Sequence, residues 1–430
     1  MPSNKKRIVI TGMGVNCPLG DNPDEFYQNL IQGKSGIGHI ESFDVSRVRC
    51  KIGGDLGGYD ILSKLKSLKP QIPKDVYKRV KKIFKTAPFA TKITMLAAID
   101  AYVHAGLFSS EFDKERMSVI VGGHNFNDNY LVRNVNQFAE EPEFIDGLLG
   151  VCFFDSDMAA CVAESLQIYG PMYTIGGTCT SAGLALRSAI KEIRSDECDL
   201  ALIGGGCIDY SPIGYQSLIL INAISYRSFN DMPEKASRPY DTQREGFVPS
   251  HGSGMLIVES LDHAQKRDAH IYAEILSVEA NSDGNHLPNP STEGQTRVMK
   301  RALRKAGIAP SEVDYVNAHA TSTPMGDLVE IHSLKKVFGA HVRQLKINAT
   351  KSMIGHTGWT AHTVELIAGI MQMNHSCLHP SINIDEIDPE VDLDVCANVR
   401  VDNYTVEHLM KCSFGFGGVN CCTIARKWEA

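Results

Sequence analysis

The stretch IGGTCTSAGLALRSAI, residues 175–190, runs from a strand-like segment through a glycine-rich turn into an amphipathic helix. Its second part repeats apolar residues at three- and four-residue spacing, which is the period of a helix with one buried face. The turn between the two patterns carries Cys179. This strand, turn and helix predict an α/β fold with a cysteine at the start of a helix.

The same alternation extends along the chain. Short β-branched runs predict strands, and amphipathic segments between them predict helices, which together indicate buried sheets covered by helices. Asp21 or Asn22 can cap a helix that Pro23 opens, and Gly307 follows the last turn of another helix. The expected strands span residues 7–11, 118–121, 200–203, 271–278, 315–318 and 345–347, and the clearest helical patterns span 182–195, 294–307 and 360–375.

Length and composition restrict the class of protein. The 430 residues suit two domains, and the polar stretch LDHAQKRDA predicts a seam that divides the chain into 1–260 and 261–430. Hydrophobic residues make up 43% and charged residues 22%, a globular balance, and the net charge of -7 argues against nucleic-acid binding. With neither an export signal nor about 18 consecutive apolar residues, we expect a soluble cytoplasmic protein without a membrane partner.

Metal and nucleotide sites are not predicted. The twelve cysteines show no CxxC pairs or Cys/His ligand spacing, so neither a zinc site nor a disulfide framework is indicated. The glycines of GMGVNCPLG do not have GxGxxG spacing, and no GxxxxGK[ST] occurs.

Three side chains are candidates for catalysis. Cys179 at a helix start meets the positive end of the helix dipole, which favours a nucleophilic thiolate; the alternative is a small buried thiol. His319 and His356 each follow a predicted strand, and ligand crevices lie at the carboxyl ends of strands in open α/β sheets. The alternative for each is a structural hydrogen-bonding histidine. The glycine-rich SFGFGG, residues 413–418, can bring backbone N–H groups close to a substrate carbonyl.

These motifs together resemble the β-ketoacyl synthase family of the thiolase superfamily, and the resemblance covers nearly the whole chain. The segments that carry it, in order, are VITGMGVNCPLGDNPDEFYQNLIQGKSGI from residue 9, GTCTSAG from 177, RPYDTQREGFVPSHGSGMLIVE from 238, NAHATSTPMGD from 317, KSMIGHTGW from 351 and SFGFGGVN from 413.

The resemblance implies a five-layered αβαβα fold built of two similar halves, usually as a homodimer. The half 1–260 would carry the nucleophile Cys179, and the half 261–430 would carry His319 and His356, the pair that handles malonyl decarboxylation. Lys351 matches the family lysine, Glu330 its ion-pair partner, and Asp327 lies beside them. The N–H groups of Cys179 and Phe416 would form the oxyanion hole, with Phe416 also the gate of the acyl pocket.

The implied activity is that of a β-ketoacyl-ACP synthase in fatty-acid-like or polyketide biosynthesis. It would join an acyl group on Cys179 to malonyl-ACP by decarboxylative Claisen condensation, without a bound cofactor or metal. Its substrates would arrive on the phosphopantetheine arm of an acyl carrier protein, and the dimer would be homomeric or formed with a related subunit.

A basic run, KDVYKRVKKIFK, interrupts an otherwise acidic chain. It is either a solvated helix face or a docking surface whose charge steers an acidic carrier protein toward the site. The run places Lys78, Arg79, Lys81, Lys82 and Lys85 in one local patch.

Several positions depart from the family pattern and favour a specialised synthase. Ser250 and His251 stand where GEGAG is common, Pro288 where elongating synthases often have threonine, Ala320 where glycine is usual, and Asn125 where the acyl pocket is often apolar.

A malonyl-ACP decarboxylase is the main enzymatic alternative. The non-enzymatic one is a partner subunit of a ketosynthase heterodimer, which the set Cys179, His319 and His356 argues against. A thiolase acting on coenzyme A is less favoured, because Cys421 and Cys422 lack the usual glycine setting.

Overall fold

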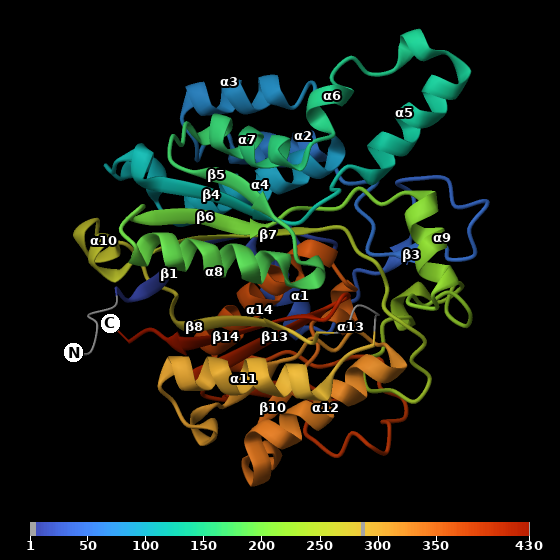
Figure 1. Ribbon diagram of the computed structural model, residues 1–430, viewed down its shortest axis with the longest axis vertical. Coiled ribbons are helices and arrows are strands. Elements are labelled where there is room, and N and C mark those ends of the chain that lie inside the picture. The colour runs from blue at the N-terminus through green and yellow to red at the C-terminus, as the bar shows by residue number, and fades with distance from the viewer. Residues whose placement is uncertain (1–5, 285–288, 430) are drawn as a thin grey trace.

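Figure 1 shows the protein as a computed structural model, which describes residues 6–284 and 289–429. The strands are β1 (Ile8–Asn16), β2 (Gly38–His39), β3 (Ile52–Gly53), β4 (Met117–Gly122), β5 (Met172–Ile175), β6 (Leu200–Gly205), β7 (Ser253–Ser260), β8 (Ala273–Ser282), β9 (Tyr315–Asn317), β10 (Lys346–Asn348), β11 (Cys377–Leu378), β12 (Val401–Asp402), β13 (His408–Gly415) and β14 (Val419–Lys427).

The helices alternate with these strands. They are α1 (Pro23–Ile31), α2 (Ile61–Leu68), α3 (Lys74–Ile83), α4 (Phe89–His104), α5 (Asp128–Glu140), α6 (Leu149–Cys152), α7 (Asp155–Leu166), α8 (Ser181–Arg194), α9 (Pro212–Leu220), α10 (Leu261–Lys266), α11 (Thr292–Ala306), α12 (Pro324–Phe338), α13 (Lys351–Ile354) and α14 (Ala361–His375). The six predicted strand regions are confirmed as β1, β4, β6, β8, β9 and β10.

Local signals set two helix ends as predicted. The side chain of Asn22 accepts a hydrogen bond from the Glu25 N–H at the start of α1, and Pro23 takes the first helical position. Gly307 ends α11 in the left-handed conformation, with φ of 75°.

The strand order repeats between the two halves of the chain. The main sheet runs β10-β9-β13-β14-β8-β1-β7-β6-β4-β5, so the first, second, third, fourth and fifth strands of each half occupy equivalent places on either side of the β8–β1 contact. In both halves the outer pairs are parallel, as in β4–β5 and β9–β10, and the inner pairs are antiparallel, as in β6–β7 and β13–β14. The two halves therefore share one topology.

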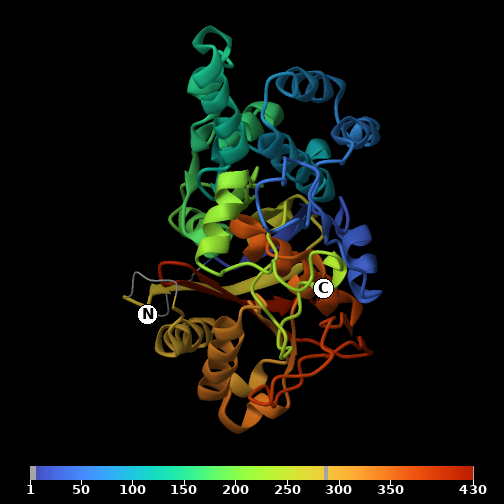
Figure 2. The same ribbon diagram turned by 90° about the vertical axis from the view of Figure 1, so that its right-hand side faces the viewer.

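Helices and sheet strands stack in five layers (Figure 1). From top to bottom lie α3, α4 and α7, then the N-terminal strands, then α8 and α14, then the C-terminal strands, and finally α11 and α12. A view turned by 90° shows the N-terminal half above the C-terminal half, with α14 between them (Figure 2). The predicted αβαβα architecture is thus confirmed.

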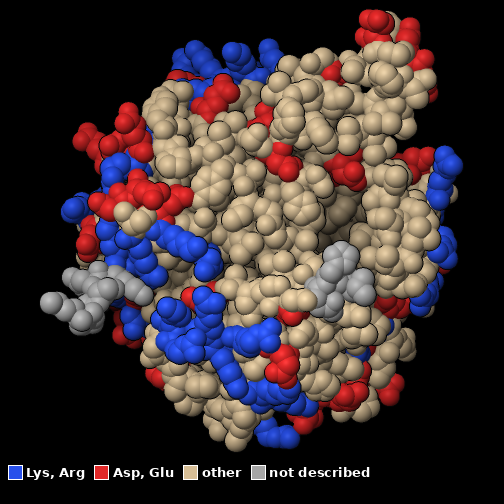
Figure 3. All heavy atoms as spheres, viewed as in Figure 1, with Lys and Arg blue, Asp and Glu red and all other residues tan. Residues whose placement is uncertain are grey.

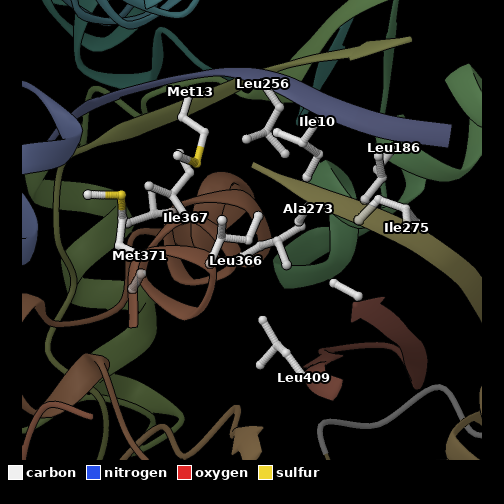
Figure 4. Close-up of a cluster of buried hydrophobic side chains, with 14 of the residues drawn as sticks. Ile10, Met13, Leu186, Leu256, Ala273, Ile275, Leu366, Ile367, Met371 and Leu409 are labelled. Atoms are coloured by element: carbon white, nitrogen blue, oxygen red, sulfur yellow. The ribbon is translucent and has the colours of Figure 1, made fainter. Parts of the chain in front are cut away.

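The largest buried cluster lies between the two sets of strands. Figure 4 shows Ile10 and Leu256 from the N-terminal half close to Leu366 and Ile367 of α14. Separate clusters bury the outer helices against each set of strands. On the N-terminal side, β1 approaches α4 so closely that a Cβ atom on Gly14 would lie 2.1 Å from the carbonyl oxygen of Ala97.

This arrangement brings four strand ends together at the site. β5 leads into the turn of Cys179, β9 into His319, β10 into α13 and His356, and β13 into Phe416. Among the residues that the structure describes, no helix is both long and apolar enough to span a membrane.

Candidate active site

Cys179, His319 and His356 line one cavity of about 630 Å³. The sulfur of Cys179 and one ring nitrogen from each histidine all lie within 4.8 Å of one another. The two imidazole rings are 5.4 Å apart between centroids and nearly perpendicular, at 89°. The predicted convergence of the three side chains is what the structure shows.

The turn around Cys179 is held in a strained shape. Thr178 has φ of 49°, a left-handed conformation that β-branched residues rarely adopt. The Thr178 hydroxyl donates to the carbonyl of Phe416 at 3.1 Å, and the Ser181 hydroxyl donates to the carbonyl of Thr178 at 2.7 Å. These bonds tie the cysteine turn to the loop after β13, with Cys179 two residues before the start of α8.

The protonation of Cys179 differs from the sequence expectation. Burial raises the pKa of the Cys179 thiol to about 11, while the Lys351 ammonium and the N–H groups of Phe416 and Cys179 lower it by less. The N–H groups at the helix start favour the thiolate, as expected, but loss of hydration acts more strongly in the opposite direction. The thiol must lose its proton as it attacks.

Hydrogen bonds decide where the two imidazoles carry their protons. The Gly358 N–H donates to Nδ1 of His356 at 3.0 Å, and the ammonium of Lys351 lies 3.2 Å from Nδ1 of His319. Neither N–H nor ammonium can accept, so both Nδ1 atoms are acceptors and each neutral ring carries its proton on Nε2. Burial, followed by the Lys351 charge, holds the pKa of both histidines well below the ordinary value.

The cavity therefore receives two neutral N–H donors beside a thiol. A sulfur and two imidazole nitrogens are also zinc ligands, but a ligating histidine normally donates from its other ring nitrogen. Here that other nitrogen accepts in both rings, which leaves Nε2 as a donor and unsuited to bind a cation.

Lys351 is buried, and its ion-pair partner is not the predicted one. Its ammonium lies 2.6 Å from Glu365 of α14 and donates to the His319 carbonyl at 2.6 Å. The expected pair with Glu330 is wrong: the Glu330 carboxylate instead accepts the N–H groups of His319 and Ala320, both at 2.8 Å. Two backbone donors satisfy Glu330 in the loop after β9, and Glu365 reaches Lys351 from the other side.

Asp327 performs a similar task one turn earlier on α12. Its carboxylate accepts the N–H groups of Tyr240 and Ser322 at 3.0 and 3.1 Å, and Arg244 lies 3.7 Å away. Burial raises the pKa of Asp327 to about 7. Asp327 and Glu330 thus fix the backbone on which His319 is mounted.

Two charged residues of the site were missed by the sequence analysis. Glu365 pairs with Lys351 and also lies 2.7 Å from Lys411 of β13, and all three side chains are at most 1% exposed. Glu365 is the single charged residue in the apolar run TVELIAG, and Lys411 is the single charged residue in the apolar run HLMKCSF. A charge in a fully buried element needs a partner, which is the signal that could have identified them.

The loop after β13 places Phe416 at the mouth of the site. Phe416 lines the cavity, the residue is 37% exposed, and its ring centroid is 6.3 Å from that of Phe247. Gly417 and Gly418 follow with φ of 81° and 74°, which lets the chain turn into β14. The N–H groups of Phe416 and Cys179 both lower the pKa of the Cys179 thiol.

The positions that depart from the family pattern have different locations. Asn125 and Ala320 line the cavity. Ser250 and His251 are buried behind it: the Ser250 N–H donates to the carbonyl of His356 at 2.9 Å, and Nδ1 of His251 lies 3.3 Å from Asp55. Pro288 lies outside the described residues.

The basic run forms α3 at the far end of the N-terminal half, where Lys and Arg side chains gather along the upper edge of Figure 3. Arg79 pairs with Asp75 at 3.2 Å and donates to the carbonyl of Ser165 at 2.8 Å, so its side chain fastens α3 to α7. The four lysines of the predicted patch are exposed: Lys78, Lys81, Lys82 and Lys85.

Comparison with known proteins gives consistent results along the chain. Residues 5–264 match the family model "Beta-ketoacyl synthase, N-terminal domain", and residues 272–385 match "Beta-ketoacyl synthase, C-terminal domain". The 3-oxoacyl-[acyl-carrier-protein] synthase 2 of Coxiella burnetii is 35% identical over 425 residues, covering 97% of both chains. The polyketide biosynthesis malonyl-ACP decarboxylase PksF of Bacillus subtilis is 30% identical, covering 99% of this chain and 98% of the relative.

A solved structure shows the same fold. A type II polyketide ketosynthase, AntDE, in complex with its acyl-carrier protein AntF, superposes with a TM-score of 0.88 at 27% identity, covering 99% of this chain and all of that one.

The buried charges around Lys351 predict a large loss of stability when their carboxylate is removed. In Glu365→Gln two ammonium groups lose their only anionic contact in the triad, and we expect the free energy of unfolding to fall by about 3–5 kcal/mol. Urea denaturation measures this change. Glu140→Gln, at an exposed position of α5, is the matched control and should stay within about 0.5 kcal/mol of the wild type. Equal stability of both variants would contradict the assignment of Glu365.

Proposed function

The chain belongs to the β-ketoacyl synthase family, and from this premise we propose that it joins an acyl group held on Cys179 to a malonyl unit carried by an acyl carrier protein. The observation that carries the proposal is that one ring nitrogen of His319 and one of His356 lie within 4.8 Å of the Cys179 sulfur, while Nδ1 of each ring accepts from another donor. Substrates would enter on the phosphopantetheine arm of the carrier, and the enzyme would act in the cytoplasm.

In the first half-reaction the sulfur of Cys179 attacks the carbonyl carbon of an acyl thioester. The carrier thiol leaves with the proton that the cysteine loses, and the acyl group remains as a thioester on the enzyme. The N–H groups of Cys179 and Phe416 would stabilise the oxyanion of the tetrahedral intermediate. The strained Thr178 turn keeps the sulfur and these donors in fixed relation.

In the second half-reaction the bond between the malonyl carboxylate and its α-carbon breaks and CO2 leaves. The electron pair forms an enolate, whose thioester oxygen accepts hydrogen bonds from Nε2–H of His319 and His356. The α-carbon then attacks the acyl carbonyl, a carbon–carbon bond forms, and the sulfur of Cys179 leaves as thiolate and takes a proton from water. Neutral rings suit this role, because they donate without protonating the nucleophilic carbon.

A second candidate function is decarboxylation of malonyl-ACP without condensation. The similarity to a polyketide malonyl-ACP decarboxylase favours it, and the two histidines alone could support it. The intact Cys179 turn favours condensation.

Dimer formation is a further part of the proposal. β5 is an edge strand of the sheet, and large apolar side chains on β5 and on the segment from α5 to α7 are exposed. Exposed apolar side chains and a free strand edge are both features of subunit interfaces. The residues are Val135, Phe138, Phe144, Leu148, Val151, Phe153, Phe154, Tyr169 and Met172.

The proposed reaction is tested by intact mass spectrometry. With a panel of acyl-carrier thioesters, the wild type should gain one acyl adduct and, after addition of malonyl-carrier protein, release a ketoacyl product. Cys179→Ala should form no adduct, whereas Cys377→Ala, a half-buried thiol outside the cavity, should behave like the wild type. His319→Ala should acylate but condense about 10²–10³ times more slowly. If malonyl-carrier protein is converted to acetyl-carrier protein and no adduct forms, the enzyme is a decarboxylase and the proposed condensation is wrong.

The exposed lysines of α3 are proposed to dock the acidic carrier protein. We expect kcat/KM for carrier-bound substrate to fall with added salt and to fall in Lys81→Glu, because both weaken electrostatic steering. Substrate carried on free pantetheine should be insensitive to both changes. Lys305→Glu, exposed at the end of α11, is the control. If α3 is a solvated helix face without a docking role, added salt and Lys81→Glu should affect kcat/KM equally for the two substrates.

The proposed dimer is tested by sedimentation equilibrium. The wild type should sediment at about twice the chain mass of 47.1 kDa, and Met172→Glu on the β5 edge should shift it toward the monomer. Val399→Glu changes an equally apolar exposed residue away from β5 and should leave the dimer intact. A wild type that sediments as a monomer would contradict the homodimer and favour assembly with a related subunit.

A further inference from the structure

A second buried lysine lies beneath the two histidines. The ammonium of Lys411 on β13 is 2.7 Å from one oxygen of Glu365, and the ammonium of Lys351 is 2.6 Å from the other. Lys411 also donates to the carbonyl of Cys412. When all three side chains are ionised, this triad carries one positive charge more than negative.

Burying such a triad lowers the stability of the fold, so its presence calls for a functional reason. Removing an ammonium from water costs several kcal/mol, and one carboxylate compensates two cations incompletely. An apolar residue would fit the pattern of β13, whose neighbouring residues Met410 and Cys412 are fully buried. Stability alone therefore does not account for a lysine at this position.

The triad is connected to the catalytic space through a short chain of contacts. Lys411 occupies Oε2 of Glu365, so Oε1 faces Lys351. The same Lys351 ammonium reaches the carbonyl and Nδ1 of His319, at 2.6 and 3.2 Å. In the parallel pairing of β13 with β9, Lys411 lies opposite Asn317, two residues before His319.

His319 is surrounded by groups that respond to this charge. Burial is the main cause of its low pKa, and the positive charges of Lys351 and Lys411 act in the same direction. Lys411 also lowers the pKa of His356 and His362. The titratable or charged groups around the ring are Lys351 from α13, His356 from the loop after it, His362 from α14, Lys411 from β13, Glu330 from α12 and Cys179 from the turn after β5.

We infer that Lys411 is a positioning residue: by occupying one oxygen of Glu365 it holds Lys351 against Nδ1 of His319, and its excess charge favours the negative charge that forms in the cavity. This inference rests on the proposed function, because the charge that forms there is the enolate oxygen of the malonyl unit. The residue acts through Glu365 and Lys351 and does not itself line the cavity among the described residues.

The test is Lys411→Met, which keeps a similar side-chain length and removes the charge. The remaining Lys351–Glu365 pair is balanced, so the thermal midpoint should be unchanged or higher. The rate constant kcat for decarboxylation of malonyl-carrier protein should fall about tenfold, the factor of roughly one pKa unit, with KM unchanged. The acid limb of the pH–rate profile should move to higher pH, since a neutral ring is lost sooner. Lys305→Met, exposed on α11, should change none of these quantities.

A second readout needs no substrate. In protein labelled with ¹⁵N-histidine, the imidazole shifts of His319 in the wild type should report the neutral Nε2–H tautomer at pH 6. In Lys411→Met they should report a mixture with the other tautomer or the imidazolium. If Lys411→Met has a lower thermal midpoint but unchanged kcat and an unchanged His319 tautomer, then Lys411 has only a structural role and the inference is wrong. If the wild type does not turn over malonyl-carrier protein, the proposed function fails, and the tautomer still decides the role of Lys411.

Discussion

The contact between the Lys351 ammonium and Nδ1 of His319 is the interaction on which the rest of the site depends. An ammonium can only donate, so the neutral ring must carry its proton on Nε2, and one nitrogen of this ring lies within 4.8 Å of the sulfur of Cys179. Keeping that ammonium buried requires Glu365, and Glu365 in turn contacts Lys411. Residues from α13, α14 and β13 therefore together determine which nitrogen of the His319 ring carries the proton.

The repeated topology explains how these groups meet. The N-terminal half supplies the cysteine turn after β5, and the C-terminal half supplies both histidines after β9 and β10. Because α8 and α14 pack between the two sets of strands, the cysteine at the start of α8 is held next to groups from the other half. Hydrogen bonds such as that from Thr178 to Phe416 complete the connection across the cavity.

The fold and the three central side chains were predictable, because ordered motifs and strand ends are visible in the sequence. The partner of Lys351 was not. Glu330 was chosen for its helical spacing from Asp327, yet both carboxylates bind backbone N–H groups, and the ion pair comes from α14. Pairing between distant elements depends on packing. The same limit applies to Cys179. Its position near a helix start can be predicted from the sequence, but the burial that raises its pKa depends on packing and cannot.

The most direct test of this account is a crystal structure of the acyl-enzyme. We predict an acyl group on the sulfur of Cys179, with its carbonyl oxygen accepting hydrogen bonds from the N–H groups of Cys179 and Phe416, and with the Nε2–H groups of His319 and His356 free for the second substrate. An acyl group on another cysteine, or a carbonyl oxygen bound to the histidines in place of those backbone donors, would contradict the division of roles on which the mechanism rests.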